Sequence, residues 1–166
     1  SERVSTNLGS VRLTERFLGS DPPSAWELAE MGDAIRAVLA EHELSATDGV
    51  GVAGTVTSLA ALDLGLVEYD SDRVHGHRLS DTAVEAQLDR LAALPLAERR
   101  EVPGLEPERA PVIVAGAAIL LEAMRFLGLR EIEVSERDLL DGAALEAAKL
   151  PEPVEGDAPP GAYTCC

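Results

Sequence analysis

Apolar residues recur at helical spacing along several stretches of the chain, with polar residues between them. Ser24 and Glu27 have the three-residue spacing of a capping box, and apolar residues follow every three or four positions, so a helix is expected to begin after Ser24. Ser80 is the predicted N-cap of a second helix, which runs to about Leu94. A third helix is expected over residues 137–149 and ends before Pro151.

Two other stretches, Leu8–Phe17 and Arg130–Ser135, alternate apolar and polar residues and predict β-strands. The stretch Pro107–Leu127 is harder to interpret, because a valine and isoleucine run near its start fits a buried strand while the rest has the composition of a helix. We favour one long, mostly buried helix that tolerates Pro111 in its first turns and ends at Gly128.

The glycine-rich stretch Asp48–Leu62, DGVGVAGTVTSLAAL, predicts a strand, a tight turn and a helix that starts near Thr55. Gly54 has no Cβ, so a backbone N–H there can approach an anion, and the first N–H groups of a helix favour negative charge. The stretch matches neither of the two common phosphate-loop patterns, and an ordinary strand-to-helix turn also needs glycine. Phosphate binding and a plain turn therefore remain alternatives on these residues alone.

Composition narrows the class of protein. The chain has 166 residues, of which 46% are hydrophobic and 27% charged, as expected for one globular domain. The formal net charge of -16 argues against a general nucleic-acid-binding surface, because such surfaces carry an excess of Lys and Arg. No apolar stretch approaches the roughly 20 residues of a membrane span, and the start does not resemble a signal peptide. A cytoplasmic protein with neither nucleic-acid nor membrane partners is expected.

Two histidines and two cysteines are further candidates for chemistry. His75 and His77 have the spacing to ligate a metal from one side of a strand, but no third His or Cys is near them in the sequence, so an ordinary strand or loop is favoured. Cys165 and Cys166 are adjacent at the end of a proline-rich stretch, residues 151–166. We expect this stretch to be a disordered tail in preference to a metal or redox site.

Five segments occur in the order LGSVRLTERFLGSDPPS, GVAGTVTSLAAL, VHG, PGLEPERAPVIVAGAAIL and REIEVSERDLLDGAAL. Together they resemble the second domain of the Ppx/GppA family of exopolyphosphatases and guanosine pentaphosphate phosphohydrolases. For residues 1–150 the resemblance implies an α/β fold, the ribonuclease-H-like domain of the actin, Hsp70 and sugar-kinase superfamily. It also implies removal of the terminal phosphate from polyphosphate, or of the 5′ γ-phosphate from pppGpp, with Mg²⁺ and an attacking water.

The resemblance also implies roles for particular residues. It places Gly51, Gly54 and Thr55 at a phosphate-facing loop of an interdomain cleft. Arg109 matches an arginine that follows PGL in the family, and its planar, bidentate donors suit a substrate phosphate. A surface ion pair with Glu106 is the alternative for Arg109.

The segment SERDLLDG resembles the S-D-x-x-x-x-x-G run that follows the last strand in the family, with glutamate where the family often has aspartate. It makes Ser135, Glu136 and Gly142 candidates for the edge of the site.

The chain departs from the family in what should precede its first strand. The D-x-G-G-G-S phosphate loop and the N-terminal domain with its general-base glutamate are missing, and these parts should hold Mg²⁺ and activate water. The chain is therefore expected to be a piece of a longer enzyme, truncated at its N-terminal strands, with no catalytic residue or metal ligand of its own. The Mg²⁺ ligands are expected mainly in the missing part and on the substrate.

The missing strands are expected to lie between the strand near Val11 and the strand near Val50. Exposed strand edges should then make the isolated chain aggregate or associate, with a homodimer as one candidate, and it should release no phosphate. A non-catalytic module that binds polyphosphate or guanosine tetraphosphate is the alternative function. An ATP-hydrolysing relative in the same superfamily is less favoured.

Overall fold

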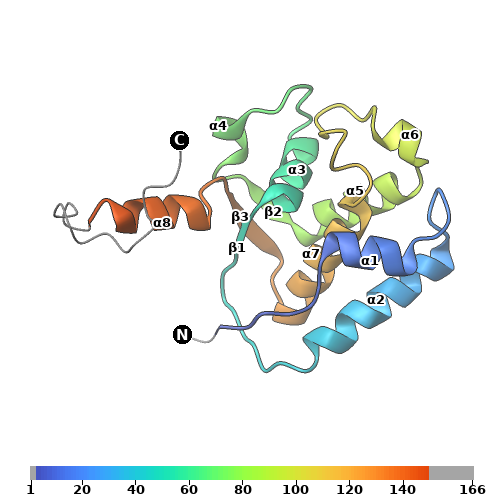
Figure 1. Ribbon diagram of the computed structural model, residues 1–166, viewed down its shortest axis with the longest axis horizontal. Helices are drawn as coiled ribbons and strands as arrows, with labels where there is room; N and C mark the ends of the chain where they lie inside the picture. Colours follow the sequence, from blue (N-terminus) through green and yellow to red (C-terminus); the bar gives the residue numbers. More distant parts are fainter. Residues whose placement is uncertain (1–2, 150–166) are drawn as a thin grey trace, which may run out of the picture. The chain divides into compact units, whose positions relative to one another are not determined.

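The structure is a computed structural model that describes residues 3–149, so the predicted tail with Cys165 and Cys166 lies outside the described residues. The chain forms two compact units, of which the first ends at Glu136 and the second begins at Arg137. The first unit contains, in order, α1 (Ser10–Phe17), α2 (Ala25–Leu39), β1 (Val50–Val52), α3 (Gly54–Asp63), α4 (Ser71–Val74), β2 (Arg78–Ser80), α5 (Asp81–Ala92), α6 (Leu96–Arg99), α7 (Ile113–Leu127) and β3 (Glu131–Ser135) (Figure 1). Helix α8 (Leu139–Ala147) belongs to the second unit.

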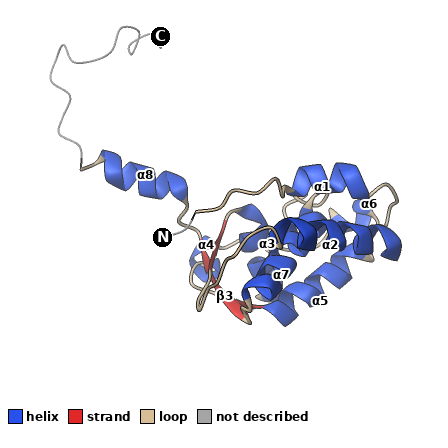
Figure 2. Ribbon diagram, turned by 90° about the horizontal axis from the view of Figure 1, so that it is seen from below, coloured by secondary structure: helices blue, strands red, loops and turns tan. Residues whose placement is uncertain are grey.

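The described strands form one mixed sheet in the order β1-β3-β2. Strand β1 is parallel to β3, with Gly51 opposite Val134, and β2 is antiparallel to β3, with Leu79 opposite Ile132. The side chains of Leu79, Ile132 and Val134 are buried, because residues two apart on a strand share a face and this face packs on helices. Figure 2 shows α2, α5 and α7 grouped beside the strands. On the opposite face Val50 is 66% exposed.

Helix α3 is the central helix of the first unit and is apolar almost all round. Every residue from Val56 to Leu62 is buried, as expected for a helix with neighbours on all sides. Two glycines let those neighbours approach closely. A Cβ at Gly51 would lie 2.7 Å from side-chain carbons of Ile132 and Val56, and a Cβ at Gly116 would lie 2.6 Å from the Thr55 hydroxyl.

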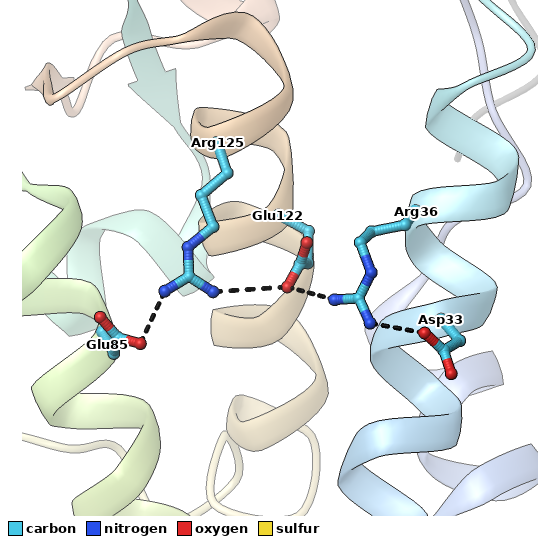
Figure 3. A network of polar contacts seen from close by, with 5 residues as sticks. All are labelled: Asp33, Arg36, Glu85, Glu122 and Arg125. Atoms are coloured by element: carbon cyan, nitrogen blue, oxygen red, sulfur yellow. Dashed lines mark hydrogen bonds and ion pairs between the residues drawn. The ribbon is translucent and has the colours of Figure 1, made fainter.

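A second apolar cluster, separate from the core around α3, lies where α1 and α2 pack on α7. Its buried residues are Leu13, Met31, Ile35, Leu39, Ala115 and Ala118. A chain of ion pairs on α2, α7 and α5 runs beside it (Figure 3). Glu122 of α7, whose side chain is 11% exposed, accepts from Arg36 of α2 at 2.8 Å and pairs with Arg125 at 3.5 Å. Arg125 also binds Glu85 of α5, and Arg36 binds Asp33. The carboxylate of Glu122 therefore links α7 to α2 directly, and Arg125 extends the chain of ion pairs to α5.

The expected α/β class is confirmed, and so are several elements. Ser24 caps α2 through a complete capping box with Glu27, and Ser80 caps α5. Gly128 ends α7 with a left-handed φ of 69°. Strand β3 covers most of the predicted segment, and Asp138 caps α8, which begins two residues later than predicted. The polar connection between α3 and α5, residues 64–80, contains the short elements α4 and β2.

The strand predicted at Leu8–Phe17 is wrong, because this segment forms helix α1. Leu13 and Phe17 are one helical turn apart and both face the second apolar cluster, while Val11 is 54% exposed. A strand would have put Val11 and Leu13 on the same face. No strand near Val11 exists, so the expectation that missing strands lie between it and the strand near Val50 is wrong as well.

Helix α7 begins at Ile113, so the prediction of one helix from about Pro107 was too long. The residues before it form hydrogen-bonded turns, with Arg109 N donating to Glu106 O at 2.9 Å and Val112 N donating to Arg109 O at 3.0 Å. Pro111 explains the limit, because it has no N–H and disfavours the helical conformation in the residue before it. No helix of the described residues is long and apolar enough to cross a membrane.

Candidate functional site

The turn between β1 and α3 leaves the start of α3 without a side-chain cap. Ala53 is the N-cap residue, its side chain accepts no hydrogen bond, and the first turn contains no acidic residue. The first helical bonds run from Val56 N and Thr57 N to Ala53 O, at 3.0 and 3.2 Å. The N–H groups of Gly54 and Thr55 precede these bonds and are the ones that a helix start leaves for an external acceptor. This end of α3 therefore favours an anion.

The backbone at Ala53 is strained. Its φ of 71° and ψ of 167° lie in a region that is essentially restricted to glycine, and it is the one non-glycine residue with positive φ among those described. Strain of this kind persists where the surrounding structure fixes the turn, and it occurs often at ligand sites. It aims the chain from the short strand β1 directly into α3.

Arg109 faces the start of α3 although it is far from it in the sequence. A Cβ at position 54 would overlap the Arg109 guanidinium, so the guanidinium lies directly against Gly54. Arg109 Nε also donates to Glu106 Oε2 at 3.3 Å, and both side chains are about half exposed. A guanidinium and the positive end of a helix dipole repel each other, and an exposed ion pair offsets this weakly. An anion that contacts both groups would relieve the repulsion.

Tyr69 lies close to α3, because its phenol interacts with Thr57 of that helix. Its hydroxyl donates to the Glu136 carboxylate. Burial, together with this bond to Glu136, raises the pKa of Tyr69 to about 12, and Thr57 and Glu106 also act on its phenol. The Tyr69 hydroxyl therefore stays protonated and continues to donate near neutral pH. Glu136 is further held through its backbone N–H, which donates to His75 Nδ1 at 3.4 Å.

The predicted site residues occupy three different settings. Gly54 and Arg109 are in direct contact. Gly51 faces Ile132 and Val56, and Thr55 packs against Gly116, so packing explains both residues.

The candidate edge residues lie further along the chain. Ser135 ends β3 and Glu136 follows it, bound to Tyr69. Gly142 belongs to α8 in the second unit, where a Cβ would meet nothing within 4 Å.

The two histidines have separate partners. His75 accepts from Glu136, whereas His77 Nε2 lies 2.7 Å from Asp63 Oδ2. No group of three or more His, Cys, Asp or Glu side chains suited to a metal occurs within residues 3–149.

Sequence reasoning missed three residues around this site: Ala53, Tyr69 and Arg99. Ala53 has no signal, because nothing in an alanine indicates positive φ. Tyr69 was visible as one of few aromatic residues in a polar connection, where its hydroxyl needs a partner. Arg99 reads as a surface charge in the sequence, yet it is only 3% exposed.

Comparison with known proteins shows which proteins this chain is similar to. The sequence profile of the Ppx/GppA phosphatase family matches residues 1–150. The chain belongs to this family. It is 36% identical over 154 residues to exopolyphosphatase 2 of Mycobacterium tuberculosis, which covers 87% of this chain and 48% of that protein. It is 29% identical over 161 residues to exopolyphosphatase 1 of the same organism, covering 93% of this chain and 46% of that protein.

Solved structures of Ppx/GppA proteins share its fold. The crystal structure of the Aquifex aeolicus family member superposes with a TM-score of 0.85 at 30% identity, covering 89% of this chain and 49% of that one. An exopolyphosphatase-like protein superposes with a TM-score of 0.81 at 34% identity, covering 87% of this chain and 49% of that one. This Ppx/GppA chain therefore spans about half the length of the relatives it matches.

Proposed function

We propose that this Ppx/GppA chain forms one wall of a phosphate cleft in a phosphohydrolase that removes terminal phosphate from polyphosphate or the 5′ γ-phosphate from pppGpp. The contact between Arg109 and Gly54 carries this proposal. It combines a guanidinium with the uncapped start of a helix, two groups that both favour phosphate. Family membership and similarity to exopolyphosphatases support the substrate class.

Each group of the wall has a role in binding. The N–H groups of Gly54 and Thr55 donate to one phosphate oxygen, and the absence of a Cβ at Gly54 leaves room for the Arg109 guanidinium beside them. Arg109 exchanges its bond to Glu106 for two parallel bonds to phosphate, which fix the orientation of the substrate. Tyr69 and Glu136 limit the other side of the turn. Ser135, at the end of β3, is a further candidate for the edge of the site.

Catalysis requires groups in addition to this wall. In the proposed protein the general base and most Mg²⁺ ligands belong to residues outside this chain, and the ion would neutralise charge on the substrate phosphates. The sheet of this chain is then completed by strands of the same protein, which gives the ribonuclease-H-like fold. Arg109 and the start of α3 hold and orient the phosphate, and they take no part in proton transfer.

The test uses the protein encoded by the full reading frame, assayed for phosphate release from polyphosphate and from pppGpp. Arg109→Ala should lower kcat/KM about 10- to 100-fold, as expected for loss of charged hydrogen bonds. Arg109→Lys should recover part of this loss, because lysine keeps the charge and lacks the planar fork. The matched control is Arg90→Ala, which removes an exposed arginine on α5.

Three results are informative. Equal activity of Arg109→Ala and Arg90→Ala would favour the alternative, in which Arg109 only forms a surface ion pair with Glu106. Saturable polyphosphate binding without phosphate release by the full-length protein would favour the non-catalytic binding module. Release from one substrate alone would fix the choice between polyphosphate and pppGpp.

A further inference from the structure

Arg99 is a buried guanidinium whose partners are all backbone carbonyl groups. It is 3% exposed. Its Nε donates to Leu91 O at 2.9 Å, its Nη2 donates to Leu94 O at 2.7 Å, and its Nη1 donates to Ala110 O at 3.2 Å. The three bonds join the end of α5 to the segment that precedes α7. A side chain with a single donor could not make them all.

The end of α5 compensates the buried charge. Burial lowers the pKa of Arg99, and the charge of Asp21 partly opposes this effect. An arginine remains charged in proteins, so the cost of burying it must be offset by partners. Leu91 and Leu94 lie at the C-terminal end of α5, where the helix dipole is negative and carbonyl groups point outward. This end of α5 therefore holds Arg99 in one place.

The third bond acts on the segment that carries Arg109. Ala110 follows Arg109 directly, is fully buried, and offers its carbonyl to Arg99. The Arg109 carbonyl is tied to the start of α7, because it accepts from Val112 N and from Ile113 N, both at 3.0 Å. Pro111 has no N–H, so its own nitrogen adds no bond to this segment. The bond from Arg99 adds a second restraint next to Arg109, at the Ala110 carbonyl, and links this backbone to the end of α5.

We propose that Arg99 is a positioning residue for the phosphate site, acting through Ala110 to hold the Arg109 guanidinium against Gly54. This inference rests on the proposed function of Arg109. It makes a specific prediction about the free energy of phosphate binding. A residue that acts through Arg109 can have no effect on binding once Arg109 is removed. The effects of changing Arg99 and Arg109 on phosphate binding must then be strongly non-additive.

The experiment titrates this chain with tripolyphosphate, followed by NMR, which detects weak binding. Arg99→Met keeps an apolar stem of similar length and removes all three donors. It should raise the Kd about two- to tenfold, the effect of one lost hydrogen bond. The same change in an Arg109→Ala background should leave the Kd of that variant unaltered. Arg100→Met, an exposed neighbour, is the matched control and should bind like the unaltered chain.

Arg99→Lys is measured alongside and decides the matter if Arg99→Met does not fold. The three donors of a lysine ammonium share one nitrogen, whereas Arg99 binds its three carbonyl groups through three different nitrogens. Arg99→Lys should therefore also weaken binding and should allow faster hydrogen exchange over residues 107–112 than in the unaltered chain. Unchanged binding by a folded Arg99 variant would overturn the inference, and so would an equal loss with and without Arg109. If Arg109→Ala itself binds tripolyphosphate normally, the proposed function fails first, whatever Arg99 does.

Discussion

Helices α2 and α3 begin in opposite ways. At the start of α2 the Ser24 hydroxyl accepts from Glu27 N, and the Glu27 carboxylate accepts from Ser24 N at 2.7 Å, so the chain supplies its own anion. Gly19 and Ser20 donate to the same carboxylate. At the start of α3 no side chain caps the helix, and Arg109 brings a positive charge to it.

The difference separates two uses of the same physical feature. The exposed N–H groups of a helix start favour negative charge wherever they occur. When a carboxylate of the chain satisfies them, the helix gains stability. When these N–H groups have no side-chain partner and lie beside a guanidinium, the free energy of unfolding is lower, and an external anion can bind there. Changes at the start of α2 should therefore alter the free energy of unfolding, and changes at the start of α3 should alter phosphate binding.

Gly54→Val should have the largest effect of the changes at these two starts. The new side chain must displace the Arg109 guanidinium, which is the flexible tip of a half-exposed side chain, so the fold should survive. Binding of tripolyphosphate should weaken at least about tenfold, because the oxygen then loses both the open backbone and the arginine. Gly9→Val is the control, since its Cβ would meet nothing closer than 4.0 Å. Normal binding by a folded Gly54→Val variant would remove this turn from the site.

Ser24→Ala tests the start of α2. It removes the hydroxyl that caps α2 and should lower the free energy of unfolding by about 1 kcal/mol, measured by urea denaturation. Tripolyphosphate binding should not change. Ser45→Ala, in an exposed loop, serves as the control. A clear loss of phosphate binding in folded Ser24→Ala would show that the two helix starts are not independent.

Ala53→Gly should raise stability. Glycine adopts the φ of 71° without steric cost, which removes strain of about 1–3 kcal/mol, while its greater freedom in the unfolded chain returns roughly 0.5–1 kcal/mol. A net gain of about 1 kcal/mol is expected in the same urea experiment, with tripolyphosphate binding retained. A loss of stability would mean that the alanine methyl group contributes packing that outweighs the strain.

The smallest effect is expected from pH at the start of α2. Hydrogen bonds from Ser20 and from Ser24 lower the pKa of Glu27 from about 4.5 to about 2. Because the folded pKa lies below the unfolded one, this contribution to stability is complete above about pH 4.5 and is lost as the pH falls towards 2. Glu27→Gln should show a shallower decline than the unaltered chain over this window. Parallel declines of the two proteins would contradict the role of Glu27.

Local patterns predicted the start of α2, and at α3 they predicted the turn, the helix start and Gly54, but not the arginine that faces them. Ser24 and Glu27 are three residues apart, so the capping box is a local feature that the sequence displays. The contact of Gly54 with Arg109 joins distant segments, and the resemblance to the Ppx/GppA family pointed to both residues before packing showed that they touch.

Other features of the fold depend on tertiary packing alone. The burial of Arg99 depends on where α5 ends relative to residue 110, which no pattern in the sequence specifies. The segment around Val11 was misjudged because Val11 and Leu13 have the two-residue spacing of a strand, whereas the spacing that decides the structure is the helical turn from Leu13 to Phe17. Both of these side chains pack on the surface of α2 and α7.

The most direct test of the central claim is an NMR titration of this chain with tripolyphosphate in which backbone amides and arginine Nε–H groups are followed together. We predict saturable shifts at the Gly54 and Thr55 amides and at Arg109 Nε, with one common Kd that rises with salt. The Ser24 and Glu27 amides should stay unchanged, because a carboxylate already occupies that helix start. Shifts spread equally over both helix starts and the surface arginines, or none at Gly54, would contradict the claim that α3 and Arg109 form a phosphate site.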